Sequence, residues 1–149
     1  MILAHRQKAF TAMWTANKVS VVHCDTNQTY FTVPADSVTC LGLSPSGTVV
    51  AVATVTPEDC YVISAYEPDR MLRCRVLIPF YVKSVAVNNT VSTVAFVSRG
   101  DKVDHDVVFL YNVDTDVLVT APNVYGPIVH VLRFVTNNSL MINTNIIVI

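Results

Sequence analysis

The sequence is dominated by a repeat, because the block at residues 38–54 occurs again, without a gap, at residues 82–98. The aligned apolar pairs are Val38 with Val82, Leu41 with Val85, Leu43 with Val87, Val50 with Val94, and Val52 with Phe96. A third copy starts at Val129, and its corresponding residues are Leu132, Phe134 and Met141. A chain built from such copies is restricted to folds in which similar small units stack against one another.

Each copy reads as short strands separated by turns. Pro, Gly and Asp occupy the turns, as in Ser44-Pro45-Ser46-Gly47, where turn geometry favours them. The repeat distance of roughly 40 to 50 residues is typical of the blades of a β-propeller. The expected strands are 38–43, 49–54, 61–66 and 72–77 in one blade (residues 37–80), and 82–87, 92–98, 107–112 and 117–120 in the next (residues 81–127).

The two ends of the chain are expected to form incomplete blades. The strands expected within residues 1–36 are 10–14, 19–24 and 28–33, and those within residues 128–149 are 129–134, 140–142 and 146–149. Residues 1–9 fit either an extra strand or a short helix. No segment keeps a helical period of 3.6 residues. The predicted fold class is therefore a single all-β domain, a partial β-propeller of about three blades.

An open stack of blades leaves apolar faces uncovered. A blade face of about 800 Å² contributes roughly 20 kcal/mol of gross burial at about 25 cal/mol per Å². Net domain stability is only about 5–15 kcal/mol. We therefore expect the chain to be the N-terminal part of a longer propeller or to be completed by a partner.

Two segments resemble the WD40 repeat. The run Leu41-Gly42-Leu43-Ser44-Pro45-Ser46-Gly47, followed by an Ala/Val strand, is similar to the strand-turn-strand core of that family, and residues 107–115 are similar to its later strand. Tyr66-Glu67 and Tyr111-Asn112 stand where the family has Trp-Asp, and the usual Gly-His dipeptide is missing. The predicted fold is thus a WD40-like propeller with degenerate repeats, and the buried polar network of typical WD40 blades is not carried over.

Within that superfamily, residues 10–145 most resemble axonemal, cilia- and flagella-associated WD-repeat proteins and the echinoderm microtubule-associated protein-like family. The shared features are the strand at residues 27–31, the segment at residues 53–56 that follows the second strand of the next blade, and the polar connection at residues 99–104. The resemblance implies a non-enzymatic scaffold in the cytoplasm, at the cytoskeleton of a cilium or flagellum. Its partners would be tubulin or axonemal proteins in a large assembly, with no catalytic residue and no cofactor.

Two other functions stay open from the sequence. Early blades of ribosome-biogenesis WD40 proteins have a similar leader, which allows a scaffold in a ribonucleoprotein particle. The central channel of a propeller also allows an enzyme or a binder of a small ligand. The sequence contains no G-x-G-x-x-G, P-loop or G-x-S-x-G motif, which argues against the second alternative.

Composition excludes several other classes. The net charge is −1 and no run of Lys or Arg occurs, so direct binding of nucleic acid is not expected. Asp36 and Glu58 bracket an uncharged stretch, but the turn at residues 44–47 divides it into two strands, so no membrane helix is expected. The N-terminus lacks a signal peptide, since His5 and Arg6 follow too few apolar residues, and an intracellular protein is expected.

Three clusters resemble reactive sites, and each has a simpler interpretation. Carboxylates with a histidine can bind Ca²⁺ or Zn²⁺, but Asp101, Asp104, His105 and Asp106 fit no metal-binding spacing and are interpreted as a solvated loop. Glu58-Asp59 is interpreted as a turn. His23-Cys24 is interpreted as strand residues on opposite faces. The four cysteines form no C-x-x-C pair and are expected to be buried thiols. No metal or cofactor is expected.

The rim loops are the predicted functional surface. Loops at residues 66–70, 99–106 and 123–127 combine aromatic residues with Arg or Pro, and loops on a rigid scaffold commonly carry recognition. The predicted partner-binding residues are Tyr66, Arg70, Arg99, Asp101, Asp104, His105 and Tyr125.

Overall fold

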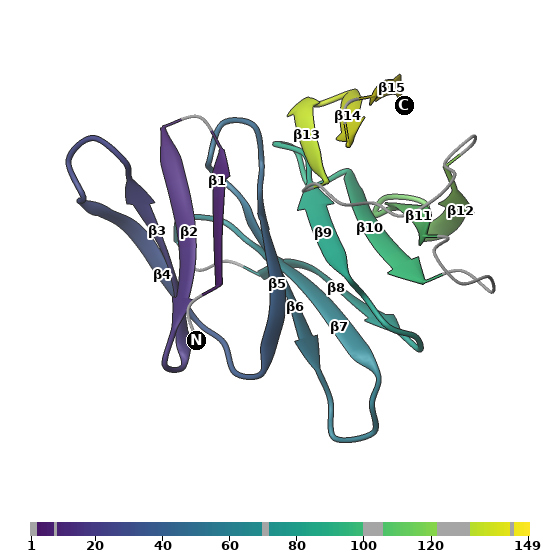
Figure 1. The fold of residues 1–149 in the computed structure, drawn as a ribbon, viewed down its shortest axis with the longest axis horizontal. Helices are drawn as coiled ribbons and strands as arrows, with labels where there is room; N and C mark the ends of the chain where they lie inside the picture. The colour runs from purple at the N-terminus through teal and green to yellow at the C-terminus, as the bar shows by residue number, and fades with distance from the viewer. Residues whose placement is uncertain (1–2, 8, 70–71, 100–105, 122–131, 144) are drawn as a thin grey trace.

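The computed structural model describes residues 3–7, 9–69, 72–99, 106–121, 132–143 and 145–149. Within these residues the chain forms four antiparallel sheets and no helix. Figure 1 shows the four sheets following one another in chain order, like blades around a common axis. In each sheet consecutive strands are neighbours, and the first strand lies at one edge. The first strands of consecutive sheets contact one another: β1 contacts β5, β5 contacts β9, and β9 contacts β13.

The strands are short and follow the turn signals of the sequence. Sheet 1 comprises β1 (Leu3–Gln7), β2 (Phe10–Thr15), β3 (Lys18–His23) and β4 (Thr29–Pro34), and sheet 2 comprises β5 (Val38–Leu43), β6 (Val50–Val55), β7 (Tyr61–Tyr66) and β8 (Leu72–Ile78). Sheet 3 comprises β9 (Ser84–Val87), β10 (Thr93–Arg99), β11 (Asp106–Asn112) and β12 (Val117–Thr120), and sheet 4 comprises β13 (Arg133–Thr136), β14 (Ser139–Ile142) and β15 (Asn145–Val148). The leader, for which the sequence left two possibilities, forms β1 and gives sheet 1 a fourth strand.

Equivalent residues of the sequence repeat occupy equivalent positions in the strand pairing of sheets 2 and 3. Leu41 pairs with Val52 in sheet 2, and Val85 pairs with Phe96 at the equivalent place in sheet 3. Sheet 4 departs from this pattern, because Phe134 pairs with Leu140. The pairing shifts by one residue between Phe134 and Thr136, and this shift moves the buried position from Met141 to Leu140. Met141 is half-buried, so its assignment as the third-copy core residue is wrong.

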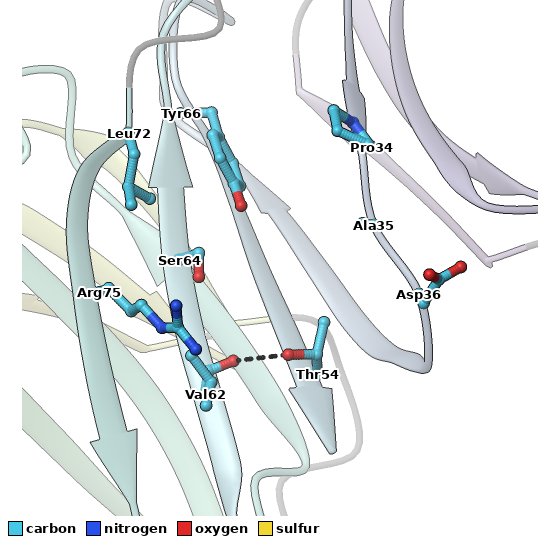
Figure 2. A pocket seen from close by; sticks show the side chains of 9 residues that line it. All are labelled: Pro34, Ala35, Asp36, Thr54, Val62, Ser64, Tyr66, Leu72 and Arg75. Atoms are coloured by element: carbon cyan, nitrogen blue, oxygen red, sulfur yellow. Dashed lines mark hydrogen bonds between the residues drawn. The ribbon is translucent and has the colours of Figure 1, made fainter. Parts of the chain in front are cut away.

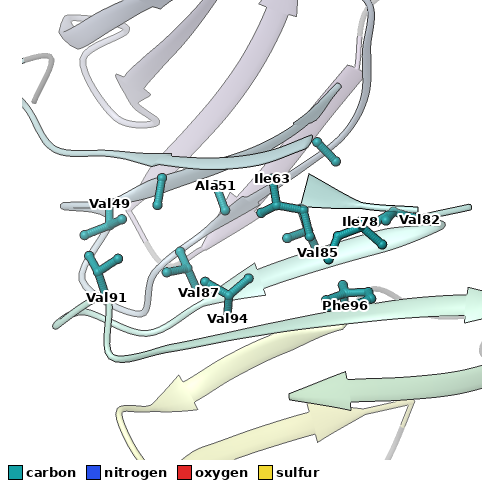
Figure 3. Packing of buried hydrophobic residues seen from close by; sticks show 12 residues of the cluster. Val49, Ala51, Ile63, Ile78, Val82, Val85, Val87, Val91, Val94 and Phe96 are labelled. Carbon is teal, nitrogen blue, oxygen red and sulfur yellow. The ribbon is translucent and has the colours of Figure 1, made fainter. Parts of the chain in front are cut away.

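Three apolar cores hold the sheets together, one between each pair of neighbours. Figure 3 shows the core between sheets 2 and 3, where Ile63 and Ala51 of sheet 2 face Val85, Val87 and Phe96 of sheet 3. The other two cores join sheet 1 to sheet 2 and sheet 3 to sheet 4. The alternation of side chains along each strand explains this arrangement, since successive residues serve opposite neighbours.

Sheets 2 and 3 are in close backbone contact at Gly42 in β5. A Cβ atom at Gly42 would overlap the carbonyl oxygen of Val85 and would lie 3.2 Å from the Cα of Ala86. The backbones of β5 and β9 therefore touch at a point where any side chain on Gly42 is excluded. The repeat has Ala86 at the position equivalent to Gly42.

The connections after the first strands are capped in the same way in sheets 2 and 3. The hydroxyl of Ser44 accepts a hydrogen bond from the Val49 N–H (3.1 Å). At the equivalent place, Oδ1 of Asn88 accepts bonds from the N–H groups of Ser92 (3.0 Å) and Thr93 (3.3 Å). These side chains stabilise the turn by satisfying N–H groups that the strand ladder leaves unpaired.

Hydrogen bonds also link these turns from sheet to sheet. Oδ1 of Asn89 accepts from the Ser46 N–H (2.9 Å), and the Asn89 N–H donates to Oδ1 of Asn137 (2.9 Å). Nδ2 of Asn88 donates to the Asn137 carbonyl oxygen (3.2 Å). The turns of sheets 2, 3 and 4 thus form a polar chain along one rim.

Replacing Asn88 with alanine is expected to lower the free energy of unfolding by about 2 kcal/mol. Asn88 is only 2% exposed, and its removal leaves the N–H groups of Ser92 and Thr93 without their acceptor. The measurement is equilibrium unfolding in urea. Thr90→Ala, an exposed change in the same turn, is the control and is expected to have a much smaller effect. Equal effects of the two substitutions would contradict this role for Asn88.

Sheets 1 and 4 also meet near the centre of the molecule. Nε2 of Gln7 in β1 donates to the carbonyl oxygen of Phe134 in β13 (2.6 Å). His5, two residues earlier, is buried, and its Nδ1 accepts a hydrogen bond from the Leu43 N–H (3.0 Å). Its Nε2 has no hydrogen-bond partner among the described residues. Burial, with the nearby charge of Arg133, lowers the pKa of His5 to about 4.

Candidate functional site

A pocket of about 220 Å³ opens between the end of sheet 1 and the outer part of sheet 2. Its nine lining residues are Pro34, Ala35, Asp36, Thr54, Val62, Ser64, Tyr66, Leu72 and Arg75. Figure 2 shows the connection after β4 forming one wall, β8 forming the opposite wall, and β6 and β7 lying between them. The pocket is therefore built by two sheets that the core between sheets 1 and 2 holds in place.

Side chains alternate along the strands of sheet 2, and this alternation places several polar side chains on the face that lines the pocket. Val62, Ser64 and Tyr66 alternate along β7 with Ile63 and Ala65, which belong to the core between sheets 2 and 3. Arg75 pairs with Ser64 in the register of β7 with β8, and Thr54 pairs with Val62 in the register of β6 with β7. Residues that pair across antiparallel strands point to the same face, so these groups converge.

Arg75 and Asp36 lie on opposite walls of the pocket, and in Figure 2 the Asp36 carboxylate points away from the Arg75 guanidinium. Neither Arg75 nor Asp36 has an ion-pair partner among the described residues. By contrast, Arg73 on the same strand lies 3.6 Å from the carboxylate of Glu67. In Figure 2 the Arg75 side chain reaches across β7 beside Val62, and the Tyr66 hydroxyl points into the same space. The guanidinium is thus available to a ligand.

Chemically, the site is suited to binding. Arginine offers several N–H donors in a fixed plane, which match a carboxylate. The hydroxyl groups of Ser64, Thr54 and Tyr66 add donors or acceptors nearby. The pocket is smaller than the roughly 300–1,000 Å³ of typical small-ligand sites. Its lining contains no cysteine or histidine, and no described group of His, Cys, Asp and Glu side chains is placed to hold a metal ion.

Of the residues predicted to bind a partner, the structure places two. Tyr66 lines the pocket. Arg99 ends β10, away from the pocket lining, and its guanidinium carbon lies 4.7 Å from the centre of the Tyr81 ring. The others, Arg70, Asp101, Asp104, His105 and Tyr125, lie outside the described residues.

Sequence reasoning missed Arg75, Asp36 and Ser64, which lie beside Tyr66 in the pocket. One signal was available for Arg75. In β8 the charged residues Arg73 and Arg75 interrupt an otherwise apolar strand, which is typical of a solvated outer strand. No comparable signal existed for Asp36, because its position depends on how sheet 1 packs against sheet 2.

The clusters that resembled reactive sites are only partly placed, because Asp101, Asp104 and His105 lie outside the described residues. Asp106 accepts a hydrogen bond from Nζ of Lys83 (2.8 Å). Asp59 lies in a turn with a φ of 62°. The His23 ring packs 4.4 Å from that of Phe10, whereas the sulfur of Cys24 contacts the Thr11 hydroxyl at 3.1 Å. His23 and Cys24 therefore serve different neighbours.

The cysteines carry free thiols, but they are half-buried rather than fully buried as expected. Burial raises the pKa of the Cys40 thiol to about 12, and it raises that of Cys74 as well. These two thiols therefore stay protonated at neutral pH, which makes them poor nucleophiles. No helix in the described part of the chain has the length and hydrophobicity to span a lipid bilayer.

No model of a known protein family matches the chain, and no curated protein sequence matches it. Solved structures with a similar fold include two examples. Hydrazine synthase of Kuenenia stuttgartiensis matches 93% of this chain and 40% of that chain, with a TM-score of 0.59 and 11% identity. The β-propeller domain of Myceliophteria thermophila Cps50 (Swd1) matches 94% of this chain and 47% of that domain, with a TM-score of 0.58 and 12% identity.

These similarities confirm the predicted fold class, an all-β β-propeller. The chain spans less than half the length of either structure. At identities of 11% and 12% the likeness shows the fold alone, because one propeller architecture hosts unrelated functions.

Proposed function

We propose that the chain is a non-enzymatic scaffold that binds other proteins, and that the pocket between sheets 1 and 2 receives an acidic side chain of the partner. The observation that carries this proposal is the exposed Arg75 guanidinium, which has no ion-pair partner among the described residues and lies on one wall of the pocket. The propeller fold supports it, since rigid sheets position the site.

The geometry favours a side chain over a free small molecule. A pocket of about 220 Å³ suits a single anchoring group, and it opens at the outer edge of two sheets, where a partner surface can approach. A carboxylate bound to Arg75 would receive charge-assisted hydrogen bonds, and Asp36 on the opposite wall would disfavour a second carboxylate nearby. The partner motif is therefore one acidic residue flanked by neutral or basic residues.

We further propose that the partner belongs to a microtubule-based assembly of a cilium or flagellum, with tubulin or an axonemal protein as the direct contact. The support for this part is the resemblance of residues 10–145 to the axonemal and microtubule-associated WD-repeat families. The corresponding localisation is cytoplasmic, at the cytoskeleton.

Co-sedimentation with polymerised tubulin and with isolated axonemes tests both parts of the proposal. The wild-type chain is expected to pellet with at least one of them. Arg75→Gln is expected to weaken that binding about tenfold, because it removes a charge-assisted hydrogen bond. Arg73→Gln removes the same charge from the same strand outside the pocket, and it is expected to bind like the wild type.

The microtubule assignment and the pocket assignment would be contradicted by different results. A chain that stays in the supernatant at saturating polymer and axoneme concentrations contradicts the microtubule assignment. If Arg75→Gln and Arg73→Gln weaken binding equally, net charge rather than the pocket controls association, and the pocket assignment is wrong.

A further inference from the structure

The outer strand of sheet 2, β8, carries side chains that extend the binding surface beyond the Arg75 pocket. Three residues of this strand belong to the core between sheets 2 and 3, namely Cys74, Val76 and Ile78. Side chains alternate along a strand, so Arg75 and Leu77 point to the opposite face of sheet 2. The pairing of Leu77 with Val62, which lines the pocket, gives the same direction, because paired residues of antiparallel strands share a face.

Exposed leucine side chains lie on both sides of Arg75 along this strand. Leu77, two positions after Arg75, is 66% exposed, and Leu72, three positions before it, is 48% exposed and lines the pocket. Figure 2 shows Leu72 and Arg75 on the same wall of the pocket. A single exposed leucine is ordinary on a protein surface, whereas two that flank a cation form a strip. This leucine strip (Leu72, Arg75 and Leu77) is apolar at both ends and positively charged between them.

The spacing within the leucine strip favours an extended ligand. Two residues along a strand span roughly 6.6 Å, and every second residue of an extended ligand repeats at the same distance on one face. An acidic side chain bound to Arg75 therefore places the side chain two positions away over Leu77. The residue between them points away from the strip and makes no contact with it. A helix fits such a straight row poorly, because its side chains rotate around the axis.

The leucine strip lies between sheets that the structure describes on both sides. Sheet 1 covers the inner strands of sheet 2, where Leu41 and Val52 are buried in the shared core, but β8 stays exposed on this side. Sheet 3 covers the other face of sheet 2. A further sheet of the stack would pack against sheet 1 or sheet 4, so it would not cover the strip. The cation at its centre instead favours a ligand that supplies a carboxylate.

We propose that the partner segment bound at the Arg75 pocket is extended and has the pattern apolar-x-acidic-x-apolar, in which x is any neutral or basic residue. This inference rests on the proposed function, since it specifies the residues around the acidic group that the pocket receives. The carboxylate binds the Arg75 guanidinium, and the apolar side chains on either side bury Leu77 and Leu72. Because the pattern is symmetrical, it covers both leucines whichever way the segment runs.

Two synthetic peptides of identical composition test the spacing. The matched peptide, acetyl-Thr-Leu-Thr-Glu-Thr-Leu-Thr-amide, has leucine two positions from the glutamate on both sides. The shifted peptide, acetyl-Leu-Thr-Thr-Glu-Leu-Thr-Thr-amide, has leucine three positions before the glutamate and one position after it. The dissociation constant of each for the full chain is measured by NMR titration. The matched peptide is expected to bind about tenfold more tightly, because only its leucines meet the exposed leucines of the protein.

Substitutions in the protein locate the contact. Leu77→Ser is expected to weaken binding of the matched peptide several-fold and to leave binding of the shifted peptide unchanged. Leu118→Ser is the matched control, because it makes the same change at an exposed leucine on the outer strand of sheet 3, and it is expected to bind like the wild type. Arg75→Gln is expected to weaken binding of both peptides, since both carry the carboxylate.

The outcomes distinguish failure of this inference from failure of the proposed function. Equal binding of the two peptides, weakened in both cases by Arg75→Gln, would support the pocket but show the spacing to be wrong. Tighter binding of the shifted peptide would also overturn the spacing. Leu77→Ser and Leu118→Ser variants that bind the matched peptide equally well would show that the strip is not the contact. Binding that Arg75→Gln leaves unchanged, or no saturable binding at millimolar peptide, would overturn both the inference and the pocket assignment.

Discussion

Replacing Gly42 with valine is expected to lower the free energy of unfolding by roughly 3 to 5 kcal/mol. The reason is the contact between β5 and β9, where a Cβ atom on Gly42 would overlap the Val85 carbonyl oxygen. A flexible side chain could move aside, but this obstacle is backbone within a paired strand, so the two sheets must separate. That separation also loosens the core between sheets 2 and 3, shown in Figure 3.

Urea unfolding of the wild type, Gly42→Ala and Gly42→Val measures this effect. The alanine variant already carries the overlapping atom, so it is expected to be destabilised, and the valine variant more so. Ser20→Val is the control, because it adds a β-branched side chain to the face of sheet 1 that no described sheet covers. A Gly42→Val protein as stable as Ser20→Val would show that the two sheets do not meet as described.

Acidification is expected to remove about 3 kcal/mol of stability through His5 alone, between about pH 6.5 and pH 4. Burial lowers the pKa of His5 from 6.5 to about 4 in the folded protein, whereas the unfolded chain keeps the ordinary value. Between these values the unfolded state binds a proton that the folded state does not bind. Stability is therefore fully present above about pH 6.5 and falls as the pH drops towards 4.

Comparing the wild type with His5→Asn separates the pH-dependent stability that comes from His5 from the part that comes from the carboxylates. Asparagine retains an acceptor for the Leu43 N–H, which His5 supplies through Nδ1, but it does not titrate. The difference in unfolding free energy between the two proteins, measured from pH 7.5 to pH 4, is expected to shift by about 3 kcal/mol in favour of the variant. A difference that is independent of pH would mean that His5 is not buried as a neutral side chain.

The repeat made the central sheets predictable. Leu41, Val52, Val85 and Phe96 are buried because alternation along a strand and a fixed offset between copies leave few other registers. Leu140 was not predictable in the same way. A register shift between Phe134 and Thr136 changes which residue of β14 is buried, and the sequence alone does not reveal where a strand contains such a shift.

The pocket was only partly predictable. Tyr66 was identified by its residue type and its place at the end of a strand, which are local properties. Arg75 and Asp36 meet Tyr66 only because sheet 1 packs against sheet 2, and such packing is a tertiary property. The thiols were expected to be buried because of their residue type, but all four are partly exposed, including Cys40 on the inner strand β5.

The topology has a consequence for how the protein forms during synthesis. Every strand pairing joins neighbours in the sequence, so each sheet is complete as soon as its own residues have left the ribosome. The bond from Gln7 to Phe134 is different, because 127 positions separate the two residues in the sequence. Sheet 1 can therefore pair its own strands early, whereas Gln7 acquires this acceptor only after Phe134 has been synthesised.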